Sequence, residues 1–231
     1  MSLFECGQYS APSFRREIKY VVRRHEIDDI RSILKTNFQP LSFNNETSLV
    51  HSIYFDTFDF ALARASIAGV AKRCKTRLRW YDSPLPKNEV FLEHKRRDSE
   101  TTGKSRQKLK LNRCLTEVTH DELLSDLRNL LEASSYLNQI TQAVTLVSYE
   151  REHFQSTKLP MRLTLDYDIT CVEQALTVKT DFPLAITDLA VVEVKVPADF
   201  TGNIEEQLFP LSLHRSRCSK YLRSLSLLGL L

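Results

Sequence analysis

The stretch KRCKTRLRWY, residues Lys72–Tyr81, decides the fold because its charged side chains recur at every second position. Side chains of a β-strand alternate between two faces, so residues two positions apart point the same way. Lys75, Arg77 and Arg79 therefore share one face of a predicted strand, and Trp80 lies on the other. The stretch predicts a strand with one basic face and one mainly apolar face.

Four further segments alternate in the same way, with charged side chains of both signs on one face and apolar side chains on the other. They are FRREIKYVV (14–22), EVFLEHKRRD (89–98), MRLTLDYDI (161–169) and AVVEVKVP (190–197). In LVSYEREHF (146–154), Tyr149, Arg151 and His153 align, but the opposite face is also polar. A half-exposed antiparallel sheet gives the same alternation, and for any single strand that is the simpler interpretation.

Two features favour a closed barrel over an open sheet. The charged faces are rich in Arg, which binds phosphate in a forked geometry, and nearly every strand also carries a carboxylate. Many long alternating strands can close into a barrel, which removes exposed edges. We therefore expect an α+β fold, a closed antiparallel β-barrel with helices packed outside. Because buried charges need partners, its lumen would hold water, counter-charges and an anionic ligand.

Basic residues are concentrated in one block of the chain. From Lys72 to Arg113 there are 14 Lys and Arg against 5 Asp and Glu, whereas the remainder has 18 against 24. A block this basic favours a polyanionic partner, although a solvated basic face has the same composition.

Composition excludes several classes of protein. The 231 residues are 42% hydrophobic and 26% charged, which excludes a mainly disordered chain. No apolar run approaches the roughly 20 residues that cross a bilayer, and the N-terminus lacks a signal-peptide core. The five Cys have neither CxxC nor Cys/His spacing, so a disulfide framework and a zinc site are not expected. We expect a cytoplasmic protein with a single domain over residues 1–231.

Apolar periodicity predicts four helices, which fit an outer layer around the sheet. They cover residues 25–38, a Leu-rich segment up to residue 131, residues 203–213 and residues 220–230. Thr119 and Glu122 form a capping box ahead of the second helix. Residues 82–88 and 98–103 are predicted to be hairpin loops.

Short motifs also follow one another along the chain in a characteristic order. They are E-x-K (17–19), YFDT (54–57), K-x-R-x-R-W-Y (75–81), F-L-E-x-K (91–95), G-K-x-R (103–106), Y-x-R (149–151), R-x-T-x-D (162–166), E-x-K (193–195) and S-K-Y (219–221). Together they resemble the VTC domain, the polyphosphate polymerase domain of the vacuolar transporter chaperone complex. That domain is a branch of the triphosphate tunnel metalloenzymes, to which CYTH phosphatases also belong. The resemblance covers residues 14–221, and Arg15 in place of the first Glu of the CYTH motif E-x-E-x-K favours the polymerase branch.

The resemblance implies a tunnel of eight antiparallel strands in which basic side chains hold a triphosphate or polyphosphate. The implied activity is transfer of the terminal phosphate of ATP to a polyphosphate chain, with Mn²⁺ or Mg²⁺ as cofactor. A polymerase that passes its product across a membrane would need a membrane-protein partner to supply the pore. Such a partner would hold the chain at the inner face of that membrane. Nucleic acid is not an expected partner, because few aromatic residues interleave with the basic ones.

Carried over residue by residue, the resemblance assigns roles to the charged side chains. The catalytic set is Arg77, Arg79, Lys95, Arg151 and Arg162. The phosphate-binding set is Lys19, Lys104, Arg106, Lys195, Ser219 and Lys220, to which the charged strand faces add Lys75 and Arg97. Ser219 is equally well explained as a helix N-cap. Glu193 is the expected metal ligand, with Glu17, Glu93 and Asp166 as weaker candidates. For Asp166 and Asp168, which share a predicted face, pairing with Arg is favoured over a metal role.

Two other functions remain open at this point. A hydrolase of the same fold would cleave inorganic triphosphate or a nucleoside triphosphate, with lumen carboxylates that hold a second metal or orient water. A non-catalytic module would bind polyphosphate or nucleotide within a membrane assembly. The products formed from ATP distinguish the three.

Overall fold

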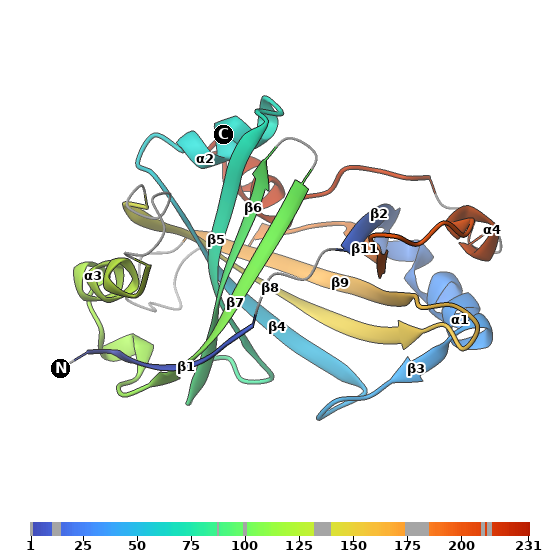
Figure 1. Ribbon diagram of the computed structural model, residues 1–231, viewed down its shortest axis with the longest axis horizontal. Helices are drawn as coiled ribbons and strands as arrows, with labels where there is room; N and C mark the ends of the chain where they lie inside the picture. The colour runs from blue at the N-terminus through green and yellow to red at the C-terminus, as the bar shows by residue number, and fades with distance from the viewer. Residues whose placement is uncertain are drawn as a thin grey trace.

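In the part of the chain that the structure describes, eleven strands form one antiparallel sheet that curls so that its two halves face each other (Figure 1). The computed structural model describes residues 2–10, 15–86, 88–98, 101–131, 140–173, 185–208, 211 and 214–231. The strands are β1 (Phe4–Ser10), β2 (Arg15–Arg23), β3 (Gln39–Leu41), β4 (Thr47–Asp56), β5 (Lys72–Tyr81), β6 (Glu89–Asp98), β7 (Thr101–Leu111), β8 (Gln142–Gln155), β9 (Arg162–Glu173), β10 (Ala185–Ile186) and β11 (Leu189–Pro197). The α-helices are α1 (Ile27–Asn37), α2 (Ala61–Ile67), α3 (His120–Leu131), α4 (Ile204–Leu208) and α5 (Lys220–Leu227).

The sheet is not closed. Its hydrogen-bonded order is β1-β7-β6-β5-β4-β8-β9-β11-β2, and within the described ranges β1 and β2 do not pair. The expected closed barrel of eight strands is therefore not confirmed. The edge strand β2 is nevertheless covered in part. The Ser216 amide donates to the Lys19 carbonyl (2.9 Å), and the Val21 amide donates to Ser216 Oγ (3.0 Å). These contacts leave fewer backbone groups of β2 unpaired.

Helices cover the outer face of each half of the sheet, as predicted. α3 packs its leucines on β4–β7, in a core that also contains Trp80. α1 and α4 pack on β2, β8, β9 and β11, on the opposite side of the molecule (Figure 1). α1 and α3 agree with predicted helices. Of the predicted helix over 203–213, residues 204–208 are helical, and 209, 210, 212 and 213 lie outside the described residues.

The prediction that the last helix also belongs to the outer layer is wrong. α5 packs on the inner face of the sheet, where Tyr221 and Leu225 join a third core with Val50, Tyr54 and Val191. The C-terminus consequently lies close to α2 at one end of the sheet (Figure 1). An amphipathic helix buries its apolar face on any apolar surface that is available, inside or outside.

The two predicted hairpin loops lie between consecutive strands of the structure. The loop over 82–88 joins β5 to β6, with residue 87 outside the described residues. Of the loop predicted over 98–103, Asp98 belongs to β6 and residues 101–103 belong to β7, and residues 99 and 100 lie outside the described residues. In the described part of the chain, no helix has the length and apolarity to span a bilayer.

Candidate functional site

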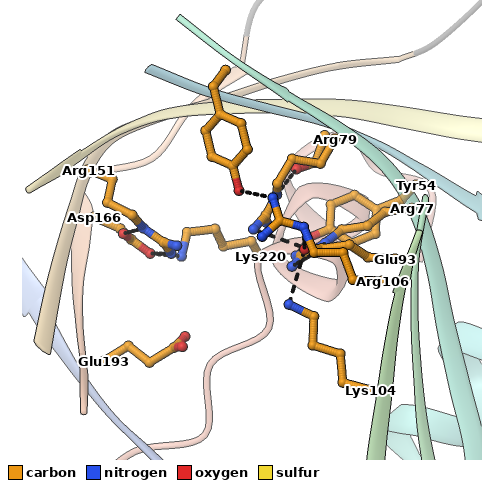
Figure 2. Close-up of polar contacts among 12 residues, drawn as sticks. Tyr54, Arg77, Arg79, Glu93, Lys104, Arg106, Arg151, Asp166, Glu193 and Lys220 are labelled. Atoms are coloured by element: carbon orange, nitrogen blue, oxygen red, sulfur yellow. Dashed lines mark hydrogen bonds and ion pairs between the residues drawn. The ribbon is translucent and has the colours of Figure 1, made fainter. Parts of the chain in front are cut away.

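Charged side chains from seven strands and α5 meet on the inner face of the sheet. Ten are cationic and four are acidic, and Figure 2 shows most of them. The cations are Lys19, Lys75, Arg77, Arg79, Lys95, Lys104, Arg106, Arg151, Lys195 and Lys220, and the acids are Glu17, Glu93, Asp166 and Glu193. The positive charges exceed the negative ones by six.

Glu93, on β6, is the centre of the first group of contacts. Arg77 Nε donates to its Oε2 at 2.7 Å, and Arg79 Nη1 lies 3.6 Å from the same atom. Lys104 Nζ donates to Oε1 at 3.0 Å, and Arg106 Nε lies 3.6 Å from it. Burial by itself would raise the pKa of Glu93, but the neighbouring Arg77 and Arg79 hold it well below its usual range. Glu93 therefore stays ionised and fixes four cations.

Asp166, on β9, is the centre of the second group and is fully buried. Arg151 binds it with both arms of its guanidinium, Nε to Oδ1 at 2.6 Å and Nη2 to Oδ2 at 2.7 Å. Lys220 Nζ, from the first residue of α5, lies 2.5 Å from Oδ2. Burial would raise the pKa of Asp166, but Arg151 and Lys220 hold it far below its usual range. These contacts tie the inner helix to the sheet.

Glu193 and Glu17, on the paired strands β11 and β2, bind lysines. Glu193 lies 2.9 Å from Lys195 Nζ and 3.4 Å from Lys19 Nζ, whose charges hold its pKa well below the usual range although burial would raise it. Glu17 accepts from Lys95 Nζ at 2.7 Å. Because Lys95 comes from β6, this ion pair spans the two halves of the sheet. The Lys95 side chain is 44% exposed against 9% for Lys220, so the Lys95 end of the charged face is the more open to solvent.

Glu193 fits a divalent cation better than the other buried carboxylates. Glu93 and Asp166 are held by buried arginines, whereas Glu193 contacts flexible lysines that can turn to another anion. Thr164, paired with Glu193 on the neighbouring strand, has a buried hydroxyl with no hydrogen-bond partner among the described residues. Among all the residues that the structure describes, there is no group of three or more His, Cys, Asp or Glu that could hold a metal ion by itself. The residues fit Mg²⁺ or Mn²⁺, which commonly take one or two protein carboxylates and complete their shell with phosphate and water.

Two tyrosines accept hydrogen bonds from the buried arginines, although sequence reasoning assigned them no role. Arg77 Nη1 donates to Tyr54 Oη at 2.9 Å, and Arg79 Nη2 donates to Tyr149 Oη at 3.1 Å. Arg79 Nε also donates to Ser52 Oγ at 3.1 Å. Ser52 and Tyr54 share the inner face of β4, and because both are uncharged, alternation of charge does not mark them. The alternation of polar and apolar residues in SIYFD (52–56) is the signal in the sequence that places Ser52 and Tyr54 on one face.

Asp56 of the YFDT motif has a structural role. Its carboxylate accepts from the amides of Leu62 (2.9 Å) and Ala63 (3.0 Å) in the first turn of α2. It also accepts from Tyr221 Oη of α5 at 2.6 Å, and the Tyr221 ring stacks on Tyr54 with centroids 5.0 Å apart. Asp56 thus holds both helices at one end of the sheet.

Two lysines of the site have lowered pKa values. Lys75 Nζ donates to Ser219 Oγ at 2.9 Å, and burial lowers the pKa of Lys75 to about 8. Burial likewise lowers the pKa of Lys104 to about 8, despite the nearby Glu93. Ser219 is also the N-cap of α5, which confirms the N-cap interpretation, and its role as a phosphate ligand stays a prediction. Bound phosphate would raise the pKa of both lysines again, because its negative charge favours their protonated form.

Two residues predicted on this face lie at its exposed margin, and a third lies elsewhere. Arg162, paired with Lys195 across β9 and β11, is the first residue of β9, and Arg97 is near the last residue of β6; both are exposed. Asp168 does not align with Asp166, because its backbone is left-handed (φ 46°) and its side chain pairs with Arg24 at 2.9 Å. The prediction that Asp168 shares the inner face is wrong.

Comparisons with known proteins agree with this architecture. The VTC domain family matches the chain over residues 14–229. No curated protein matches it. A candidate adenylate cyclase from Bacillus halodurans is similar in structure, with a TM-score of 0.53 and 14% identity over 91% of this chain and 96% of its own. A candidate adenylyl cyclase from Hippeastrum, described as having a dominant triphosphatase activity, has a TM-score of 0.50 and 16% identity over 92% of this chain and 96% of its own. At these identities the likeness shows the fold alone.

Proposed function

The chain belongs to the VTC domain family, and from this membership we propose that it is a metal-dependent polyphosphate polymerase. It would transfer the terminal phosphate of ATP to a polyphosphate chain bound on the inner face of the sheet. The family and the structural neighbours support the broader assignment as a triphosphate-tunnel protein. Growth of a polyphosphate chain is the part of the proposal that needs an experiment.

The excess of positive charge on the inner face carries the proposal. Ten cations share four carboxylates there. Buried cations are unfavourable, and burial lowers the pKa values of Lys75 and of Lys104 to about 8, for Lys104 despite its ion pair with Glu93. A linear polyanion carries negative charge along its whole length and therefore compensates cations that are spread over several strands.

The reaction needs alignment and charge neutralisation more than a covalent partner. An oxygen of the terminal phosphate of the chain attacks the γ-phosphorus of ATP, the bond from that phosphorus to the β,γ-bridging oxygen breaks, and ADP leaves. Arg77 and Arg79, held in place by Glu93, would bind oxygens of the transferred group. Arg151 and Lys220, held by Asp166, would bind the next phosphate from the opposite wall.

Glu193, with the Thr164 hydroxyl beside it, would hold the divalent cation. When bound, Mn²⁺ or Mg²⁺ supplies additional neutralisation of the charge on the β- and γ-phosphates. Lys19 and Lys195, which contact Glu193 in this structure, would then turn to phosphate oxygens.

Incubation with ATP, Mn²⁺ and a trace of pyrophosphate, followed by gel separation and a polyphosphate stain, tests the proposal. We expect a ladder of long chains from the wild type and none from Arg77→Ala, which removes a cation at the proposed transfer site. Arg113→Ala is the matched control, because Arg113 forms a surface pair with Glu122 (3.2 Å) and its loss should leave the ladder unchanged. Release of orthophosphate without chains would identify a triphosphatase instead. Tight polyphosphate binding without turnover would identify a binding module.

A further inference from the structure

Tyr54 has an unused hydrogen-bond donor beside the buried arginines. We propose that the Tyr54 hydroxyl donates its hydrogen to an oxygen of the phosphate bound at Arg77 and Arg79, and so is a further ligand-contacting residue. The identity of the ligand, a linear condensed phosphate, rests on the proposed function. The contact itself does not require that the chain grows.

The hydrogen-bond geometry around Tyr54 leads to this inference. Tyr54 is 5% exposed, and its Oη accepts from Arg77 Nη1 at 2.9 Å (Figure 2). A guanidinium has donors only, so the hydroxyl hydrogen of Tyr54 is not used in this contact. Within the described residues, no contact gives that hydrogen an acceptor. A buried donor without an acceptor costs free energy, which an anionic oxygen at this place would recover.

The Tyr54 ring is held so that its hydroxyl cannot turn away. It stacks on Tyr221 with an interplanar angle of 15°, and Tyr221 is fixed through its hydrogen bond to Asp56. Arg77 binds Glu93 with its other nitrogens, which fixes the direction of the Arg77–Tyr54 contact. Arg77 and Tyr54 thus form a pair in which one group supplies charge and the other supplies a neutral donor.

The charged groups that face Tyr54 are positive. They are Lys75, Arg77 and Arg79 on β5, Lys19 on β2 and Lys220 on α5, and the neutral Tyr221 completes the surroundings. The nearby carboxylates, Glu93 and Asp56, bind Arg77 and Tyr221. The cations lower the pKa of Tyr54 to about 8, although burial would raise it. Bound phosphate would oppose this, because its negative charge disfavours the phenolate.

Calorimetric titration with tripolyphosphate tests the contact. Tyr54→Phe keeps the ring and its stacking, so the fold is retained, and it removes the hydroxyl that carries the donor hydrogen and accepts from Arg77. We expect about 10- to 100-fold weaker binding, as for hydrogen bonds to charged groups. Tyr20→Phe is the matched control, because Tyr20 is buried on the outer face and its hydroxyl has no partner among the described residues. It should bind as the wild type does. Wild-type affinity in Tyr54→Phe would overturn the inference.

Ultraviolet absorbance of the phenolate gives an independent readout, which Lys75 and Lys104 do not contribute to. We expect a phenolate step near pH 8 in the wild type that Tyr54→Phe lacks. Saturating tripolyphosphate should move this step to higher pH. A step that tripolyphosphate does not move would overturn the inference, because Tyr54 would then not contact the ligand. A wild type that binds tripolyphosphate but makes no polymer would contradict the proposed function alone.

Discussion

Asn in place of Asp166 should destabilise the protein strongly, because it removes the carboxylate that Arg151 and Lys220 share, and both cations would lose this ion pair. The Asp166 side chain is 0% exposed and those of Arg151 and Lys220 are 9% exposed. Removal of one partner from a buried pair costs about 3–5 kcal/mol, since the remaining charge is left uncompensated. For a chain of this length that corresponds to a fall in Tm of about 6–20 °C.

Thermal unfolding with and without tripolyphosphate measures this effect. Glu89→Gln is the control, because Glu89 forms an ion pair of similar length with Lys108 (2.7 Å) that is about half exposed, and its loss should cost at most about 1 kcal/mol. Tripolyphosphate should recover part of the loss in Asp166→Asn, because the anion compensates the freed cations and a ligand at 100 times its Kd stabilises by about 2.7 kcal/mol. Equal Tm values for Asp166→Asn and Glu89→Gln would refute the reasoning.

Two further predictions concern pH. The pKa values of Glu93, Asp166 and Glu193 are depressed in the folded protein, so their stabilisation is present above the unfolded value of about 4 and is lost as the pH falls below it. Urea unfolding should therefore give a smaller free energy of unfolding in acid than near neutrality, and an unchanged value would contradict the prediction. Because the pKa values of Lys75 and Lys104 are about 8, tripolyphosphate affinity should fall as the pH rises above 8. Calorimetry should show a weaker pH dependence in the double variant Lys75→Ala, Lys104→Ala, and the same dependence in both proteins would show that these lysines are not involved.

Alternation of side chains predicted the strands well. β5 and β6 begin and end at the predicted residues, because charged side chains recur at alternate positions in both, Lys75, Arg77 and Arg79 in β5 and Glu93, Lys95 and Arg97 in β6. The same pattern carries no information about closure, since it describes one strand at a time. The edge of β2 is covered in part by Ser216 and not by β1. This arrangement depends on contacts of Ser216 with Lys19 and Val21, which lie far from it in the sequence.

The positions of α5 and Asp168 show where local patterns fail. The amphipathic pattern of α5 identifies its apolar face but not whether the surface beneath it lies inside or outside the sheet. Lys220 and Tyr221 reach Asp166 and Asp56 only because the helix lies inside. For Asp168, alternation assumes an extended backbone, and the left-handed conformation that Asp tolerates breaks this assumption.

Most of the candidate site was predictable, because charge on an alternating face marks the residues of the inner wall. The grouping of cations around Glu93, Asp166 and Glu193 was not predictable, since it depends on the register of neighbouring strands. Tyr54 was missed because it is neutral, and only its contact with Arg77 shows that it belongs to the site.

Phosphorus NMR of the protein with ATP, Mn²⁺ and a trace of pyrophosphate tests most directly whether phosphate is transferred to a chain. The proposed polymerase predicts that the resonance of mid-chain phosphates grows in step with ADP, with little orthophosphate. Growth of orthophosphate in step with ADP, without mid-chain phosphates, would contradict it.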